Sequence, residues 1–127
     1  MSIDVHYIIE VFREICKRTL QSLLGEASGE AVLFLLRKNL GRDPSEVFWE
    51  DPGAVYREME RIFGIGAKVL INFLVTKINE KFDLNMNPEH FLDLMRSGDQ
   101  HSVEEIRSFL AKIAELYKKG EGVSEGE

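Results

Sequence analysis

The chain has 127 residues, 44% of them hydrophobic and 30% charged, which is typical of one globular domain and excludes a disordered chain. Its single cysteine, Cys16, excludes an internal disulfide, and its longest apolar run, residues 31–36, is far shorter than the ~20 residues of a membrane-spanning helix. The net charge of −6 weighs against strong non-specific binding of nucleic acid, which depends on Lys and Arg.

The N-terminal forty residues predict two amphipathic helices. Apolar residues recur at helical spacing over residues 5–24, and Gly25 predicts the end of this helix because glycine adopts the left-handed conformation without strain. Ser28 is expected to cap the second helix, which ends before Gly41. Because residues 31–36 make this helix apolar on most sides, we expect it to lie at the centre of the fold.

Two Asp-Pro pairs predict two short helices that meet at a corner. Asp43 and Asp51 are each followed by proline, so each aspartate is expected to cap a helix whose first residue is proline, and Gly64 ends the second helix. Phe48 and Trp49 are neighbours on the first short helix, which cannot bury both fully on one face. One of the two is expected to pack inward, while the other covers the neighbouring helix or contacts a protein partner, so Phe48 and Trp49 form a candidate partner site.

The segment Gly64-Ile65-Gly66-Ala67-Lys68 is a second candidate site. A glycine-rich turn that leads into a helix can present backbone N–H groups to an anion, and Lys68 would add a positive charge. The complete phosphate-loop pattern is missing, because no Gly-Lys-Ser or Gly-Lys-Thr follows. Gly64, Gly66 and Lys68 are therefore either an anion-binding turn or a simple junction between two helices.

The rest of the chain predicts three further helices and completes an all-α fold. A long helix follows Gly66, Asn87 caps a short helix over residues 88–96, and Ser102 begins the last helix with a capping box. We expect a compact, partly orthogonal array of about seven helices, three of them long. Residues 1–119 form a single helical domain, and residues 120–127 form an acidic disordered tail.

No group of residues carries a recognisable catalytic or metal-binding pattern. His90 and Asp93 lie three apart with His101 nearby, but no Glu-x-x-His pair or second cysteine accompanies them. Glu58 and Glu60 are alternate residues of a helix, so they point away from each other and are expected to form a solvated face. The sequence predicts a protein that is not an enzyme and needs no cofactor and no metal.

Nucleic-acid binding is the alternative function. The helix pair around residues 88–119 could form a helix-turn-helix, in which the start of the second helix enters the major groove. Glu104 and Glu105 occupy that start and would repel phosphates, so nucleic acid is not the expected partner.

The single cysteine bears on the cellular location of the protein. Cys16 lies among the apolar positions of the first helix, where an unpaired cysteine is usually a buried thiol. One free thiol and the lack of a secretory leader predict a cytoplasmic protein. Because no apolar run is long enough to span a membrane, we also expect no membrane partner.

The stretch from Arg61 to Leu70, which contains Phe63-Gly64 and Gly66-Ala67, resembles the Nitrosopumilus output domain, type five. This small, mostly archaeal helical domain occurs alone or attached to signalling proteins, so the resemblance implies an output or interaction role and no catalytic residue. Together these features predict a non-enzymatic protein-interaction or signal-output module that presents helical surface to a protein partner or to a second copy of itself.

Overall fold

The computed structural model describes residues 3–125, with side chains described as far as Gly120. Within residues 3–125 all regular structure is helical, which confirms the all-α prediction, and the three longest helices are α1, α5 and α7. None of these helices is long and apolar enough to cross a membrane. The seven helices are α1 (Val5–Leu24), α2 (Glu26–Leu40), α3 (Pro44–Glu50), α4 (Pro52–Phe63), α5 (Gly66–Phe82), α6 (Pro88–Ser97) and α7 (Gln100–Glu125).

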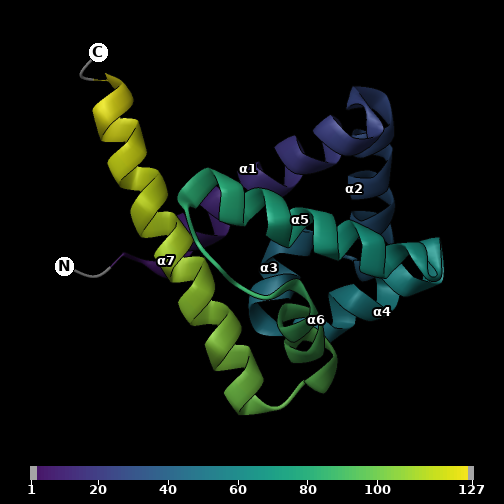
Figure 1. The fold of residues 1–127 in the computed structure, drawn as a ribbon. Helices are drawn as coiled ribbons and strands as arrows, with labels where there is room; N and C mark the ends of the chain where they lie inside the picture. The colour runs from purple at the N-terminus through teal and green to yellow at the C-terminus, as the bar shows by residue number, and fades with distance from the viewer. Residues whose placement is uncertain (1–2, 126–127) are drawn as a thin grey trace.

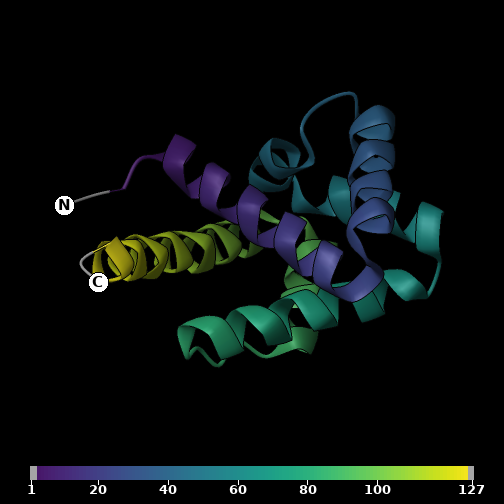
Figure 2. The same cartoon turned by 90° about the horizontal axis from the view of Figure 1, so that it is seen from above.

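The helices cross at steep angles around α1. This helix packs against α2, α3, α5 and α7, and Figure 2 shows it between α2 and α3 on one side and α5 and α7 on the other. The short helices α3 and α6 lie in the middle of the molecule, α4 lies toward the side of α2, and α7 runs along the opposite side (Figure 1). The expected partly orthogonal array is therefore observed.

A line of four phenylalanine rings joins four helices through the core. Phe12 of α1 lies 4.7 Å from Phe48 of α3, measured between ring centroids. Phe48 lies 6.1 Å from Phe91 of α6, which in turn lies 5.7 Å from Phe109 of α7. These separations are those of favourable aromatic pairs, each of which stabilises the fold beyond the apolar area that it buries.

Local hydrogen bonds form the helix starts that the sequence predicts at Asp43, Asp51 and Asn87. The Asp43 carboxylate accepts a hydrogen bond from the Ser45 N–H, and Asp51 accepts one at 3.2 Å from the N–H of α4's third residue. The side chain of Asn87 accepts from two first-turn N–H groups of α6, at 2.8 and 3.1 Å. Each side chain satisfies backbone donors that a helix start leaves without a partner.

The predicted start at Ser28 is wrong. Helix α2 begins at Glu26, immediately after Gly25, so Ser28 lies inside its first turn. Gly25 ends α1 with a positive φ of 94° and also precedes the first residue of α2. Because this one glycine reverses the chain, no linker is left in which a serine cap could form.

The predicted start at Ser102 is wrong as well, because α7 already begins at Gln100 and Ser102 is buried in its first turn. Asp99 takes the capping role instead, since its carboxylate accepts a 2.8 Å hydrogen bond from the Ser102 N–H. Hydrogen bonds from the Ser97 hydroxyl and from Ser102 hold the pKa of Asp99 below its usual value. The cap is therefore a carboxylate three residues earlier than predicted.

Helix α2 lies at the edge of the fold, so the prediction that it is central is wrong. It buries a narrow stripe formed by Gly29, Val32 and Leu36. Phe34 and Leu35 point outward, with 65% and 41% of their surfaces exposed. The apolar run therefore supplies a buried stripe and an exposed apolar face on the same helix.

Gly29 explains how α2 is held at this edge. A Cβ atom on Gly29 would lie 3.0 Å from the backbone nitrogen of Gln21 and 3.1 Å from the carbonyl carbon of Leu20. The backbones of α1 and α2 therefore touch at this residue, and only glycine leaves room for the contact.

The predicted tail over residues 120–127 is only partly described. Helix α7 runs to Glu125 and so passes the expected boundary at Gly120. Residues 126 and 127 lie outside the described residues, and the disorder of the tail stays a prediction.

The Gly29 contact predicts opposite outcomes for two glycine-to-alanine changes. Gly29→Ala should destabilise the fold by about 1–3 kcal/mol, because the added methyl group overpacks the α1–α2 contact. Gly120→Ala has open space around its Cβ and should raise stability by up to ~0.5–1 kcal/mol, because alanine is the better helix former. Urea unfolding followed by circular dichroism measures both, and a stabilised Gly29→Ala variant would disprove the close contact.

Candidate interaction face and apolar cavity

The two side chains of the candidate partner site, Phe48 and Trp49, lie in different environments. Phe48 is only 4% exposed and lies in the line of aromatic rings, so it has no surface to offer a partner. Trp49 is half-buried beneath Arg107 of α7, whose guanidinium lies 5.0 Å from the centroid of the indole ring. Arg107 Nε also donates a 3.0 Å hydrogen bond to the Trp49 carbonyl oxygen. The corner at α3 is therefore packed against α7.

The turn of Gly64, Gly66 and Lys68 lies at the surface, where Ile65 is 84% exposed. The Ala67 N–H donates to the Gly64 carbonyl at 3.1 Å, and the Lys68 N–H donates to the Ile65 carbonyl at 3.2 Å. Two of the N–H groups that would hold an anion are therefore already engaged within the turn. The geometry is that of a junction between two helices.

The polar residues considered for chemistry pair with one another. His90 Nε2 lies 2.7 Å from a carboxylate oxygen of Glu105 and joins α6 to α7. Glu58 is buried and lies 3.1 Å from the guanidinium of Arg61, so the predicted solvated face is wrong for this residue. Helix α2 packs against α4 here, and the Asn39 side chain of α2 donates a 3.5 Å hydrogen bond to Glu58. Among the described residues, no group of three His, Cys, Asp or Glu side chains could hold a metal ion.

The start of α7, which would enter the groove of DNA in a helix-turn-helix, presents carboxylates. Glu104 is exposed and accepts a hydrogen bond from the Gln100 side chain at 3.1 Å. Glu105 is the partner of His90. The acidic surface expected from the sequence is present there, and it does not favour nucleic-acid binding.

The outward side of α2 is the first surface that the structure itself points to. Phe34, at its middle, is 65% exposed, and a side chain of this size is usually buried. Residues three and four apart lie on the same side of a helix, so the exposed residues form one continuous surface. We define the outer face of α2 as Ala27, Glu30, Ala31, Phe34, Leu35 and Lys38, all of which are exposed.

Charges on this face are ordered along the helix. Glu30, Phe34 and Lys38 are spaced by four residues, so one line carries a carboxylate, an exposed aromatic ring and an ammonium. In the described part of the chain neither Glu30 nor Lys38 has an ion-pair partner. The outer face therefore has an acidic end and a basic end.

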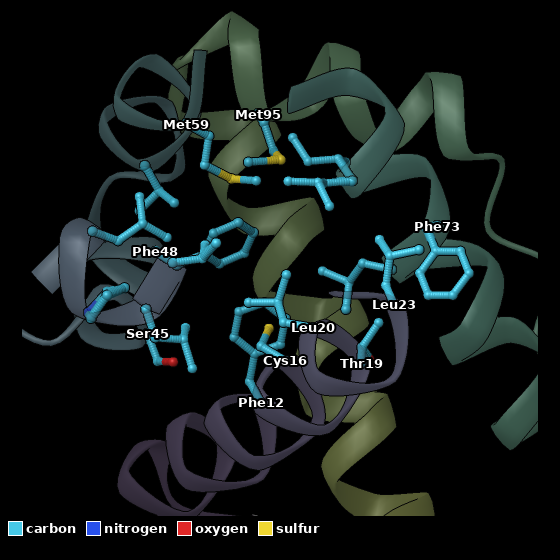
Figure 3. Close-up of a pocket in the computed structure, with 18 of the residues that line it drawn as sticks. Phe12, Cys16, Thr19, Leu20, Leu23, Ser45, Phe48, Met59, Phe73 and Met95 are labelled. Atoms are coloured by element: carbon cyan, nitrogen blue, oxygen red, sulfur yellow. The ribbon is translucent and has the colours of Figure 1, made fainter. Parts of the chain in front are cut away.

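An apolar cavity lies on the inner side of α2. It has a volume of about 80 Å³, and its walls come from helices α1 to α6. Figure 3 shows Phe12 and Leu20 of α1, Phe48 of α3 and Phe73 of α5 around it. Its few polar wall atoms include the thiol of Cys16, whose pKa burial and the nearby Asp43 carboxylate raise to about 12, so this thiol is uncharged at neutral pH. The wall is almost entirely apolar.

A second depression, bordered by charged side chains, adjoins the cavity between α1 and α5. Thr19 lines both spaces, so it marks the boundary between them. Arg18, Lys77 and Lys81 line the depression together with one carboxylate, Glu80. Lys77 Nζ also lies 5.4 Å from the centroid of the Phe73 ring, which belongs to the cavity wall. A basic surface therefore borders an apolar interior.

Neither surface was found from the sequence. The run over residues 31–36 indicates an apolar helix but not which side the neighbours cover, although Gly29 in a regular spacing with Val32 and Leu36 was a usable signal for a narrow buried stripe. The cavity draws its walls from six helices, so no local pattern marks it.

Comparison with known proteins returned no matching family model, no matching curated protein and no matching solved structure. The resemblance around Phe63-Gly64 and Gly66-Ala67 stays a prediction.

The cover over Trp49 can be tested by fluorescence, since Trp49 is the chain's one tryptophan. Arg107→Ala should increase quenching of Trp49 by acrylamide, shift its emission to longer wavelength and cost about 0.5–1 kcal/mol of stability, because it removes a cation–π contact. Arg96→Ala, which removes a similar contact over Tyr56 at 5.9 Å, is the matched control and should leave the Trp49 signal unchanged. Equal quenching in the two variants would show that Arg107 does not cover the indole.

Proposed function

We propose that this chain is a non-enzymatic protein-interaction module that associates with a second copy of itself through the outer face of α2. The observation that carries the proposal is the 65% exposure of Phe34 in the middle of an apolar face. Exposed large apolar groups gathered on one face mark interaction sites more often than solvated surface. Aromatic residues are also prominent among the side chains that contribute most to binding energy.

The order of the charged residues along α2 favours one arrangement of the two copies. In an antiparallel pair whose two-fold axis passes at Phe34, residues equally far before and after Phe34 face each other. Glu30 then lies opposite Lys38 of the partner subunit, and Lys38 lies opposite Glu30 of the partner subunit. A parallel pair would place like charges together and would be opposed electrostatically. The face is therefore complementary to itself in one orientation.

The size of the residues beside Phe34 supports close packing of the two helices. Ala27 and Ala31 are small, so the helix axes can approach before side chains collide. Leu35 adds apolar area at 41% exposure. A contact formed by one helix from each subunit buries less than the standard protein–protein interface, so a weak, concentration-dependent dimer is expected.

Substitution of the central ring tests the interface directly. Phe34→Glu should keep the protein monomeric at every concentration, because it places two carboxylates at the two-fold axis. The unmodified chain should shift from monomer to dimer between micromolar and millimolar concentration in sedimentation experiments. Val69→Glu is the matched control, since Val69 is 64% exposed on α5 and lies outside the outer face of α2. A monomeric unmodified chain, or equal effects of the two variants, would exclude the proposed dimer.

Charge reversal tests the orientation of the pair. Glu30→Lys and Lys38→Glu should each weaken the dimer, by about 0.2–1 kcal/mol for each of the two symmetric ion pairs. The double variant restores opposite charges at both positions and should recover most of the affinity. High salt should reduce the difference between the single variants and the unmodified chain. A double variant that binds no better than either single variant would exclude the antiparallel arrangement while leaving a dimer open.

A further inference from the structure

The apolar cavity on the inner side of α2 does not contribute to the proposed dimer and requires its own explanation. Protein interiors pack as densely as organic crystals, so an unfilled apolar space of about 80 Å³ that reaches into the core and is partly open to solvent is a departure from normal packing. Its walls offer few hydrogen-bond partners, and water without such partners is not held in a cavity of this kind. A void of this chemistry is best filled by hydrocarbon, which gains the dispersion contacts that the walls lack.

The charged side chains of the neighbouring depression indicate which head group the hydrocarbon would carry. Beyond Thr19, the depression between α1 and α5 is lined by three cationic side chains, Arg18, Lys77 and Lys81, and one carboxylate, Glu80. Arg18 is held at 3.0 Å by Glu14, so even after that pairing one positive charge is in excess. In a chain whose net charge is −6, this local excess of positive charge favours an anion at the mouth of the cavity.

We propose that the cavity and the depression together bind a single-chain amphiphile with an anionic head, of the alkyl carboxylate class. The alkyl tail enters past Thr19 and lies against the apolar walls. The carboxylate stays in the depression, where it accepts hydrogen bonds from Lys77 and Lys81. This site shares no residue with the outer face of α2, so it does not depend on the proposed dimer.

Lys77 is the residue best placed to hold the head. Its ammonium lies over the Phe73 ring of the cavity wall at 5.4 Å, so it stands where the apolar and basic surfaces meet. Its present partner is Glu80, at 3.6 Å, and both side chains are largely exposed to water. An exposed pair of this kind contributes little free energy, so a ligand carboxylate can replace Glu80 at small cost.

The volume of the cavity limits the length of the tail. Each methylene that leaves water for an apolar site contributes about 0.8 kcal/mol, which is roughly a fourfold gain in affinity. A cavity of about 80 Å³ holds roughly three carbon groups of about the size of a water, ~30 Å³ each, so only the end of the tail fills it, while the carbons nearer the head lie along Ile15 and Ile78 of the depression. The affinity should therefore rise from butanoate to hexanoate to octanoate and then level off. A membrane surface or a micelle would not produce this plateau.

Titration calorimetry with the unmodified chain tests both halves of the site. We expect octanoate to bind more tightly than octanol, which lacks the charge, and octylammonium to bind least. Equal affinities of octanoate and octylammonium would exclude the basic head site. Equal affinities of butanoate and octanoate would exclude the cavity as the tail site.

Single substitutions then test which residues form the ligand site. Lys77→Gln should weaken octanoate binding by about two- to fivefold and leave octanol binding unchanged, because only the charge contact is lost. Lys112→Gln, an exposed lysine of α7, is the matched control and should bind as the unmodified chain does. Thr19→Phe should block the entrance and abolish binding of both octanoate and octanol, with circular dichroism to verify the fold. Unchanged octanoate binding in Lys77→Gln, or in a folded Thr19→Phe variant, would overturn the proposal.

The Phe34→Glu variant tests whether the ligand site is independent of the proposed dimer. It should prevent self-association and leave octanoate affinity unchanged, because Phe34 does not line the cavity. A loss of octanoate binding in this variant would overturn the assignment of the ligand to the α1–α5 side.

Discussion

The contact between α1 and α2 at Gly29 is the constraint on which both surfaces depend. A Cβ atom on Gly29 would lie only about 3 Å from backbone atoms of α1, so the two backbones are in close contact at this residue. Helix α2 is consequently held along a narrow stripe that continues through Val32 and Leu36. Because the stripe is narrow, the rest of an apolar helix is left facing solvent, and this exposure is what a partner would remove.

The same helix also forms one wall of the cavity. Val32, Leu33 and Leu36 line the space on its inner side, while Leu70 and Leu74 of α5 line it from across the void. Helix α2 packs against α1, α3 and α4, and it shares the wall of the cavity with α5. One helix therefore has two apolar sides. The proposed dimer would cover the exposed outer face, and the proposed ligand would contact the side that lines the cavity.

Asp43 shows how a local signal acquires a tertiary role. Its side chain caps α3, as its position before proline predicts, and it also accepts a 2.9 Å hydrogen bond from Nε of Arg13 on α1. That hydrogen bond raises the pKa of the arginine further above its usual value. The cap thus ties the start of α3 to the central helix. On the same short helix, Phe48 packs into the aromatic line and Trp49 lies beneath Arg107.

The sequence by itself determined the helices and the starts at Asp43, Asp51 and Asn87, because caps and glycine stops depend on hydrogen bonds and φ angles within a few residues. It did not determine which side of a helix is buried, because that depends on neighbours distant in the chain. Phe34 and Phe48 both belong to apolar segments, yet one is 65% exposed and the other 4%. The same limit applies to the cavity, whose walls come from six helices. Only the tertiary structure decides such questions, since burial is a property of the assembled surface and not of the local pattern.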